Sequence, residues 1–240
     1  MFRDQKLARF YRRLPRSAFR PLRITAWLGC GVAGDYTALP FDSILYYQAH
    51  REALGPIYVA TPGSAYDNRS EGMTMPLPIA RCEEHTPKWY YAASFAVWPQ
   101  TVADGVDHWN KRFDIQYSHL IDFGKRKATV NISSGHYKAY HMPLWYRHAL
   151  WVRWYVLGEP ERIRELLSCC THIGKKTSQG WGSVLRWEVE EWHSDWSVRR
   201  DDGQLMRAIP AAEGIVHGFR PSYWLPEHQT VCAVPGDIRE

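Results

Sequence analysis

Residues 149–190 carry the pattern that most constrains the fold. The apolar run Ala149-Leu-Trp-Val-Arg-Trp-Tyr-Val-Leu157 has the length of a buried strand. Pro160 then begins a predicted helix that ends at Gly174, because its apolar residues follow i, i+3, i+4, i+7 spacing. A glycine-rich loop leads to 184–190, where alternation places Leu185, Trp187 and Val189 on the buried face. We therefore expect strand, helix, loop and strand in this order.

A similar unit opens the chain. Residues 22–28 alternate between apolar and polar side chains, as in a half-buried strand. Asp42 is the predicted N-cap of a helix that runs to Leu54 and stops at Gly55-Pro56. Its apolar stripe consists of Phe41, Ile44, Leu45, Ala49 and Ala53. Two such units favour an α+β fold of the ferredoxin-like or RRM-like type, with an antiparallel sheet backed by two helices.

The remaining segments suggest the domain organisation. Residues 1–23 carry eight Arg or Lys against one acidic residue, so the net charge of +5 is concentrated at the N-terminus. We expect a basic arm at 1–20, which either contacts a phosphate backbone or is solvated. The α+β domain should span 21–200, with an insertion at about 56–147 that contains strand-like aromatic runs at 89–98 and 113–117. Residues 201–240 should pack on that domain.

Several classes of protein are disfavoured by the composition. The five cysteines are odd in number and form no CxxC pair, which favours a reducing, intracellular location over a disulfide framework. The longest run without charged residues, 89–103, is too short for a membrane span. Metal-capable side chains at 83–85 and 104–108 lack a spacing that fixes ligand geometry, so we expect neither a metal nor a cofactor.

The glycine-rich loop is the first candidate binding site. It does not match a P-loop, because Cys169 stands five residues before Gly174 and the loop follows a helix. It does not match a dinucleotide fingerprint either, since Leu185 stands where the third glycine is required. Its glycines could let successive N–H groups face a phosphodiester chain, while its lysines neutralise phosphates and its tryptophan stacks on a base. A tight helix-to-strand connection is the alternative. The candidate residues are Gly174, Lys175, Lys176, Thr177, Ser178, Gln179, Gly180, Trp181 and Gly182.

The second candidate site is the segment 125–141. It mixes basic, β-branched and aromatic residues in the manner of a protruding hairpin, which could grip nucleic acid. The candidate residues are Lys125, Arg126, Lys127, His136, Tyr137, Lys138, Tyr140 and His141.

Several of these stretches resemble one protein family. The loop at 174–182, placed after a helix and before the last strand, is similar to the glycine-rich loop of the RAMP proteins of CRISPR systems. Together with Pro21-Leu-Arg-Ile-Thr-Ala26, Val32-Ala-Gly-Asp35, Phe41-Asp-Ser-Ile-Leu45 and His136-Tyr-Lys-Ala-Tyr-His-Met-Pro-Leu144, it resembles the Csf-three family of type IV systems. The resemblance spans about residues 21–192.

This resemblance implies a function as well as a RAMP fold. It implies a non-catalytic, Cas-five-like subunit that holds the 5′ handle of the guide RNA (crRNA) in the prokaryotic cytoplasm. Such a subunit would cap a filament of Cas-seven-like backbone subunits, beside a large-subunit counterpart and near the entry of target DNA. The glycine loop would shape the RNA groove, and the segment 125–141 would form a thumb-like projection.

Two other functions remain open at this point. A Cas-six-like, metal-independent endoribonuclease would use a histidine to deprotonate a 2′-hydroxyl, and His50, His136 and His141 are the candidates. A stand-alone RRM-type RNA-binding module would keep the fold without the assembly. The chain lacks an RNP1-like string, which argues against this second alternative.

Overall fold

The computed structural model describes residues 19–54, 76–83, 88–122, 124 and 129–240, and it is mixed α+β. Most of the predicted basic arm and the candidates Lys125, Arg126 and Lys127 lie outside the described residues. The strands are β1 (Arg20–Leu28), β2 (Val32–Ala33), β3 (Arg81–Cys82), β4 (Tyr90–Tyr91), β5 (Val97–Trp98), β6 (Ala103–Lys111), β7 (Tyr140–His148), β8 (Trp151–Gly158), β9 (Val184–Glu191), β10 (Ile209–Gly218), β11 (Gln229–Ala233) and β12 (Ile238–Arg239). The helices are α2 (Phe41–Leu54) and α4 (Pro160–Ser168), with 3-10 turns η3 (Ile115–Leu120), η4 (Gly135–Tyr137), η5 (Thr177–Gln179) and η6 (Pro226–His228).

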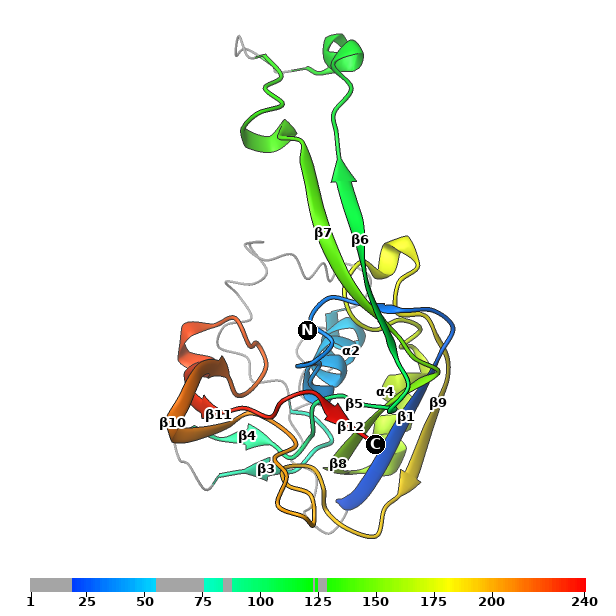
Figure 1. Cartoon of the computed structure of the whole chain (residues 1–240), viewed down its shortest axis with the longest axis vertical. Coiled ribbons are helices and arrows are strands. Elements are labelled where there is room, and N and C mark those ends of the chain that lie inside the picture. The colour runs from blue at the N-terminus through cyan, green and yellow to red at the C-terminus, as the bar shows by residue number, and fades with distance from the viewer. Residues whose placement is uncertain (1–18, 55–75, 84–87, 123, 125–128) are drawn as a thin grey trace, which may run out of the picture.

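The centre of the fold is a five-stranded sheet in the order β12-β5-β8-β1-β9. β1 is antiparallel to both β8 and β9, β5 is antiparallel to β8, and β12 joins β5 in parallel. The predicted strands at 22–28 and 149–157 are confirmed as β1 and β8. Helices α2 and α4 pack on one face of this sheet, around the buried side chains of Ile24 and Trp154 (Figure 1).

A second apolar cluster forms on the other side of β8. Tyr155 points to the face opposite Trp154, because neighbouring residues of a strand face opposite ways. It packs with side chains from the C-terminal part of the chain, namely Met206, Ala208, Ile209, Phe219, Cys232 and Ile238. Residues from 205 onward therefore bury apolar surface against the sheet.

The predicted N-cap role of Asp42 is wrong. α2 begins at Phe41, so Asp42 lies inside the first turn, with a fully buried side chain. It accepts a hydrogen bond of 2.7 Å from the Tyr223 hydroxyl and lies 3.5 Å from Nη1 of Arg207, which is also fully buried. Long-range pairing with the C-terminal part of the chain replaces the local cap.

Two predictions near the glycine loop, the end of the helix and the burial of Leu185, are also wrong. α4 ends at Ser168, well before Gly174, and a bridge between His172 and Ser183 joins the two ends of the loop. Leu185 is 71% exposed instead of buried. A β-bulge pairs Trp27 with Arg186 but Leu28 with Val184, so the register passes over Leu185.

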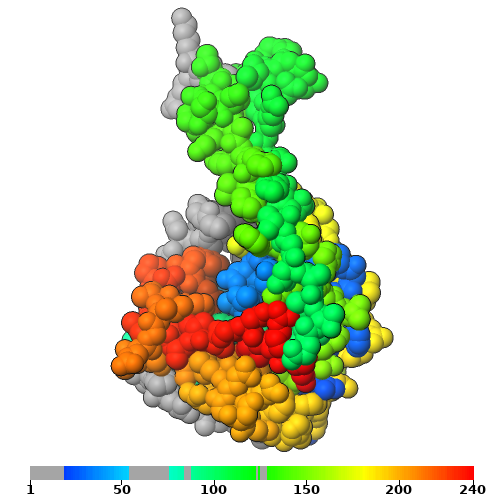
Figure 2. All heavy atoms as spheres, in the orientation of Figure 1, coloured from blue at the N-terminus to red at the C-terminus, as the bar shows by residue number. Residues whose placement is uncertain are grey.

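The middle of the chain contains both scaffold and projection. Residues 97–98, within the range expected to be an insertion, form β5 of the central sheet. β6 and β7 pair from Ala103 with His148 to Lys111 with Tyr140, and this hairpin projects far from the body (Figures 1 and 2). The expected strand at 113–117 is wrong, because the backbone forms the 3-10 turn η3, capped by the side chain of Asp114.

Candidate nucleic-acid interface

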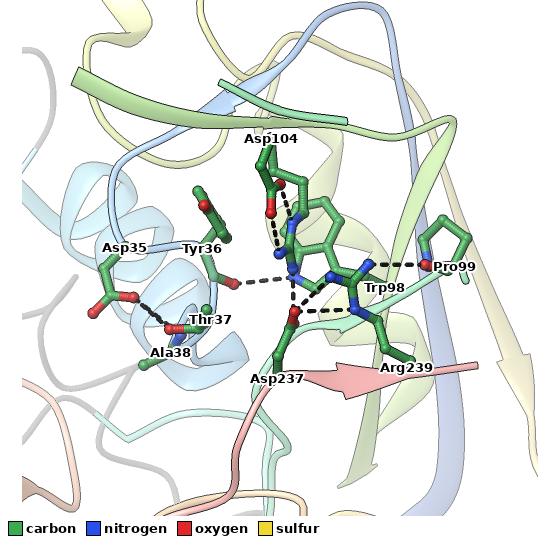
Figure 3. A network of polar contacts seen from close by, with 10 residues as sticks. Asp35, Tyr36, Thr37, Ala38, Trp98, Pro99, Asp104, Asp237 and Arg239 are labelled. Carbon is green, nitrogen blue, oxygen red and sulfur yellow. Dashed lines mark hydrogen bonds and ion pairs between the residues drawn. The ribbon is translucent and has the colours of Figure 1, made fainter. Parts of the chain in front are cut away.

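The projecting hairpin is fixed to the body at its base by Arg147. The guanidinium of this nearly buried residue donates to both carboxylate oxygens of Asp104 on β6, at 2.6 and 2.7 Å. It also donates to Asp237 at 2.7 Å and lies 4.3 Å from the ring centroid of Tyr36 (Figure 3). Arg239 donates to the same Asp237 carboxylate. Figure 2 shows the C-terminal segment, in red, against this base, so one arginine joins both hairpin strands to the body.

The electrostatics of this anchor favour the ionised carboxylates. The hydrogen bond from Arg147 holds the pKa of Asp104 below its usual value. Burial opposes ionisation of Asp237, but the hydrogen bonds from Arg147 and Arg239 outweigh it and lower the pKa of that carboxyl. The anchor is therefore fully charged at neutral pH.

The glycines of the loop permit close approach between backbones. Gly174, Gly180 and Gly182 have φ values of 82°, 92° and 69°, in the left-handed region. A Cβ on Gly182 would lie 1.8 Å from the carbonyl oxygen of Ile173, and one on Gly174 would lie 2.7 Å from that of Ala33. Gly180 has open space around it and is needed for its φ alone. Two of the three glycines therefore serve packing within the protein.

The loop amides do not form the row of free donors expected from the sequence. Lys175 and Gly182 donate to the carbonyls of Ala33 and Gly31, both at 2.8 Å. Within η5, Gln179 and Gly180 donate to the carbonyls of Lys176 and Thr177. These four N–H groups are therefore satisfied inside the fold. The exposed groups of the loop are instead the side chains of Lys175, Thr177, Ser178 and Gln179.

The loop packs directly on the hairpin. Trp181 lies with its ring centroid 4.8 Å from that of Tyr146 on β7. The Tyr146 ring in turn covers Gly105 on β6, where a Cβ would approach its hydroxyl oxygen to 2.4 Å. Nζ of Lys176, a residue with φ 57°, lies 3.4 Å from the ring centroid of Trp109. The glycine-rich loop and the projecting hairpin, which were two separate candidate sites in the sequence, are therefore in contact in the structure.

Basic and aromatic side chains continue along the hairpin beyond this contact. The rings of Trp109 and Tyr140 are stacked at 6.2 Å. Nζ atoms of Lys111 and Lys138 lie 5.9 and 5.7 Å from the Tyr140 ring centroid, and Lys111 also donates to the carbonyl of His136 at 2.7 Å. We call this set the loop–hairpin surface: Lys175, Lys176, Trp181, Trp109, Lys111, Lys138 and Tyr140.

Sequence reasoning missed part of this surface. Trp109 and Lys111 lie outside the segment 125–141 that was expected to project. Trp109 and Lys111 share a face of β6 with period 2, which was the available signal. Their pairing with β7 is non-local, so the sequence alone did not place them beside Tyr140.

The candidate histidines do not converge. His141 alternates with Tyr140 and so lies on the other face of the hairpin, where its ring stacks on that of His108 at 4.4 Å. Its Nδ1 lies 2.5 Å from Oδ1 of Asn110. His136 lies in η4 near the tip, with its ring edge-on to Tyr137 at 5.1 Å.

His50 is buried. Its side chain is 2% exposed, its ring lies 4.3 Å from that of Tyr46, and burial lowers its pKa to about 4. An RNA hydroxyl cannot reach it without rearrangement of α2, which argues against His50 as a general base.

Other site types find no support in the described part of the chain. Within the described ranges, no group of three or more His, Cys, Asp or Glu side chains could hold a metal ion. The helices among those residues include none that is both long and apolar enough to cross a membrane.

Comparison with known proteins identifies the family. No curated protein matches the chain. The family described as CRISPR type IV associated protein Csf3 matches residues 20–235, which include the whole central sheet except β12, and also the glycine loop and the projecting hairpin. The chain therefore belongs to the Csf3 family of type IV CRISPR-associated proteins.

Proposed function

We propose that the chain is a non-catalytic RNA-binding subunit of a type IV CRISPR ribonucleoprotein. In this proposal, the loop–hairpin surface holds the 5′ handle of the guide RNA. The observation that carries the proposal is the contact of Lys176 with Trp109, at 3.4 Å. This contact joins the glycine loop to the projecting hairpin, so their lysines and aromatic rings form one continuous surface.

The chemistry of that surface suits single-stranded RNA. Lysine ammonium groups neutralise phosphates, and unstacked bases pack on aromatic rings. Trp181 already packs on Tyr146 and keeps only part of its ring exposed. Tyr140 and Trp109, which are also partly exposed, are further stacking candidates beside Lys111 and Lys138, while Lys175 and the polar residues of η5 contact the backbone.

The central sheet supports the proposal of a ferredoxin-like RAMP fold. The order β5-β8-β1-β9 is fully antiparallel, with α2 in the connection from β1 to β5 and α4 between β8 and β9. Two split βαβ units interleave in this way. We propose a RAMP domain at 21–200, preceded by a basic arm at 1–20 and followed by a C-terminal segment at 201–240 that packs on it.

We also propose the assembly partners that the family resemblance implies. The subunit would cap a filament of Cas-seven-like backbone subunits in the prokaryotic cytoplasm, beside the large-subunit counterpart and near incoming target DNA. The hairpin face opposite Trp109 supports a protein contact, because Val106 and Trp145 are paired there and are 39% and 58% exposed. RNA on one face and protein on the other would use both sides of the hairpin.

Salt-dependent RNA binding tests the proposal. A fluorescently labelled 5′ handle RNA is titrated with the wild type and with a Lys175→Ala/Lys176→Ala variant, from 50 to 300 mM salt. We expect weaker binding and a slope of log K against log salt that is smaller by about one to two. An Arg164→Ala/Arg186→Ala variant, which removes two exposed charges from α4 and β9, should keep the wild-type slope. Equal slopes for wild type and lysine variant, or equal affinity for a scrambled RNA, would contradict the proposal.

A further inference from the structure

Two arginines from distant parts of the sequence lie against one indole ring. The guanidinium carbon of Arg81, in β3, lies 4.2 Å from the ring centroid of Trp89. That of Arg220, just after β10, lies 4.6 Å from the same centroid. Trp89 precedes β4, which pairs with β3, so strand pairing holds Arg81 near Trp89, and Arg220 reaches the same ring from the C-terminal part of the chain.

Among the described residues, no carboxylate forms an ion pair with either guanidinium. Within the described residues, Arg81 and Arg220 form no ion pair, whereas Arg147, Arg153, Arg162 and Arg164 each pair with a carboxylate. Nε of Arg220 is buried and has no hydrogen-bond partner there. Two positive charges therefore share one aromatic ring, and within the described ranges neither of them is in an ion pair.

The two charges are close enough to oppose each other. Burial lowers the pKa of Arg220, and the positive charge of Arg81 lowers it further. Tyr91 and Glu227 act in the opposite direction, and Glu227 makes no ion pair with either arginine. An anion between the guanidinium groups would relieve this repulsion. Guanidinium forks match phosphate oxygens in geometry and stay charged at any working pH.

We propose that Arg81, Trp89 and Arg220 form a second nucleic-acid contact, which binds phosphodiester groups. It rests on the proposed function, since assembly into a CRISPR ribonucleoprotein is what brings nucleic acid to the chain. β3, β4 and β10 lie on the body of the protein, away from the projecting hairpin (Figure 1). The contact is thus separate from the loop–hairpin surface.

The phosphates at this contact belong either to guide RNA beyond the handle or to target DNA. Three labelled probes separate the sources: an eight-nucleotide handle RNA, a 30-nucleotide RNA that extends the handle, and a 30-base-pair DNA. Each probe is titrated with the wild-type protein, with the double variant Arg81→Gln/Arg220→Gln and with the control variant Arg164→Gln. The control removes an exposed arginine of α4.

The inference predicts a selective loss. The double variant should bind one or both long probes about fivefold to tenfold more weakly, with a salt slope smaller by about one to two. It should bind the handle RNA as the wild type does, and Arg164→Gln should bind all three probes normally. Unchanged affinity for both long probes would overturn the inference.

The experiments distinguish failure of this inference from failure of the proposed function. If the lysine variant loses handle binding while the arginine double variant binds all three probes normally, this inference alone is refuted. If the lysine variant binds the handle normally while the arginine double variant loses binding to a long probe, the handle proposal alone is refuted. If the double variant does not fold by circular dichroism, phenylglyoxal modification of the wild type replaces it. Protection of Arg81 and Arg220 by a long probe supports the contact, and modification at the unprotected rate overturns it.

Discussion

Replacement of Arg147 by methionine should detach the projecting hairpin from the body. Met keeps much of the apolar stem but removes the hydrogen bonds to Asp104 and Asp237 and the cation over Tyr36. Breaking a fully buried ion pair by removal of one partner costs about 3–5 kcal/mol. Here the two carboxylates are 40% and 31% exposed and can rehydrate, so the expected loss of unfolding free energy is about 3 kcal/mol.

Urea denaturation at pH 7 measures this loss, and an Arg164→Met variant provides the matched control. Arg164 pairs with Glu161 on the surface of α4, so its replacement should cost no more than about 1 kcal/mol. A loss below about 1 kcal/mol for Arg147→Met would refute the view that this arginine holds the hairpin. Handle-RNA affinity should also fall in Arg147→Met, with an unchanged salt slope, because no phosphate contact is removed.

The same anchor predicts a pH dependence with a definite sign. The pKa values of Asp104 and Asp237 are lowered in the folded state. The stabilisation is therefore complete above the unfolded-state pKa of about 3.9 and is lost as the pH falls through the lower folded-state values. The difference in stability between wild type and Arg147→Met should shrink below about pH 4. A difference that stays constant down to pH 2 would contradict this account.

Three further predictions test the loop, the core and the absence of catalysis. Gly182→Ala should strongly lower the stability of the protein, because its Cβ would meet a carbonyl oxygen at 1.8 Å. Gly180→Ala has open space around its Cβ and should cost only about 1–2 kcal/mol, from its φ alone. Thermal melts compare the two variants, and equal losses of stability would contradict the geometry. Arg207→Met should cost about 3–5 kcal/mol, since it leaves the buried Asp42 without its cationic partner and two backbone carbonyls without their donor. Urea titration giving less than about 1 kcal/mol would count against this. Repeat RNA incubated with the protein in EDTA should stay intact on a gel; one defined cut that His136→Ala or His141→Ala abolishes would establish a ribonuclease instead.

Local patterns determined the framework of the domain. β1, β8 and the start of α4 were predicted from alternation, an apolar run and an N-terminal proline, because each of these signals depends on neighbours within a few residues. The same patterns placed the glycine loop between helix and strand. They also excluded the P-loop and dinucleotide motifs from residue order alone, and the family resemblance that they supported is confirmed over residues 20–235.

Only the tertiary structure decided what the site residues contact. Asp42 was predicted to be an N-cap because the local sequence gives no sign of its actual partner, Arg207, which lies 165 positions away in the chain. Leu185 looked buried because a bulge cannot be seen in a period-2 pattern. Trp109 had no visible role until β6 paired with β7 and brought it to Lys176. The sequence thus determined the strands and helices whose signals are local, such as β1, β8 and the start of α4, but not the strands β6, β10 and β11. The joining of loop and hairpin into one basic, aromatic surface depended on pairings between distant segments, which only the packed fold specifies.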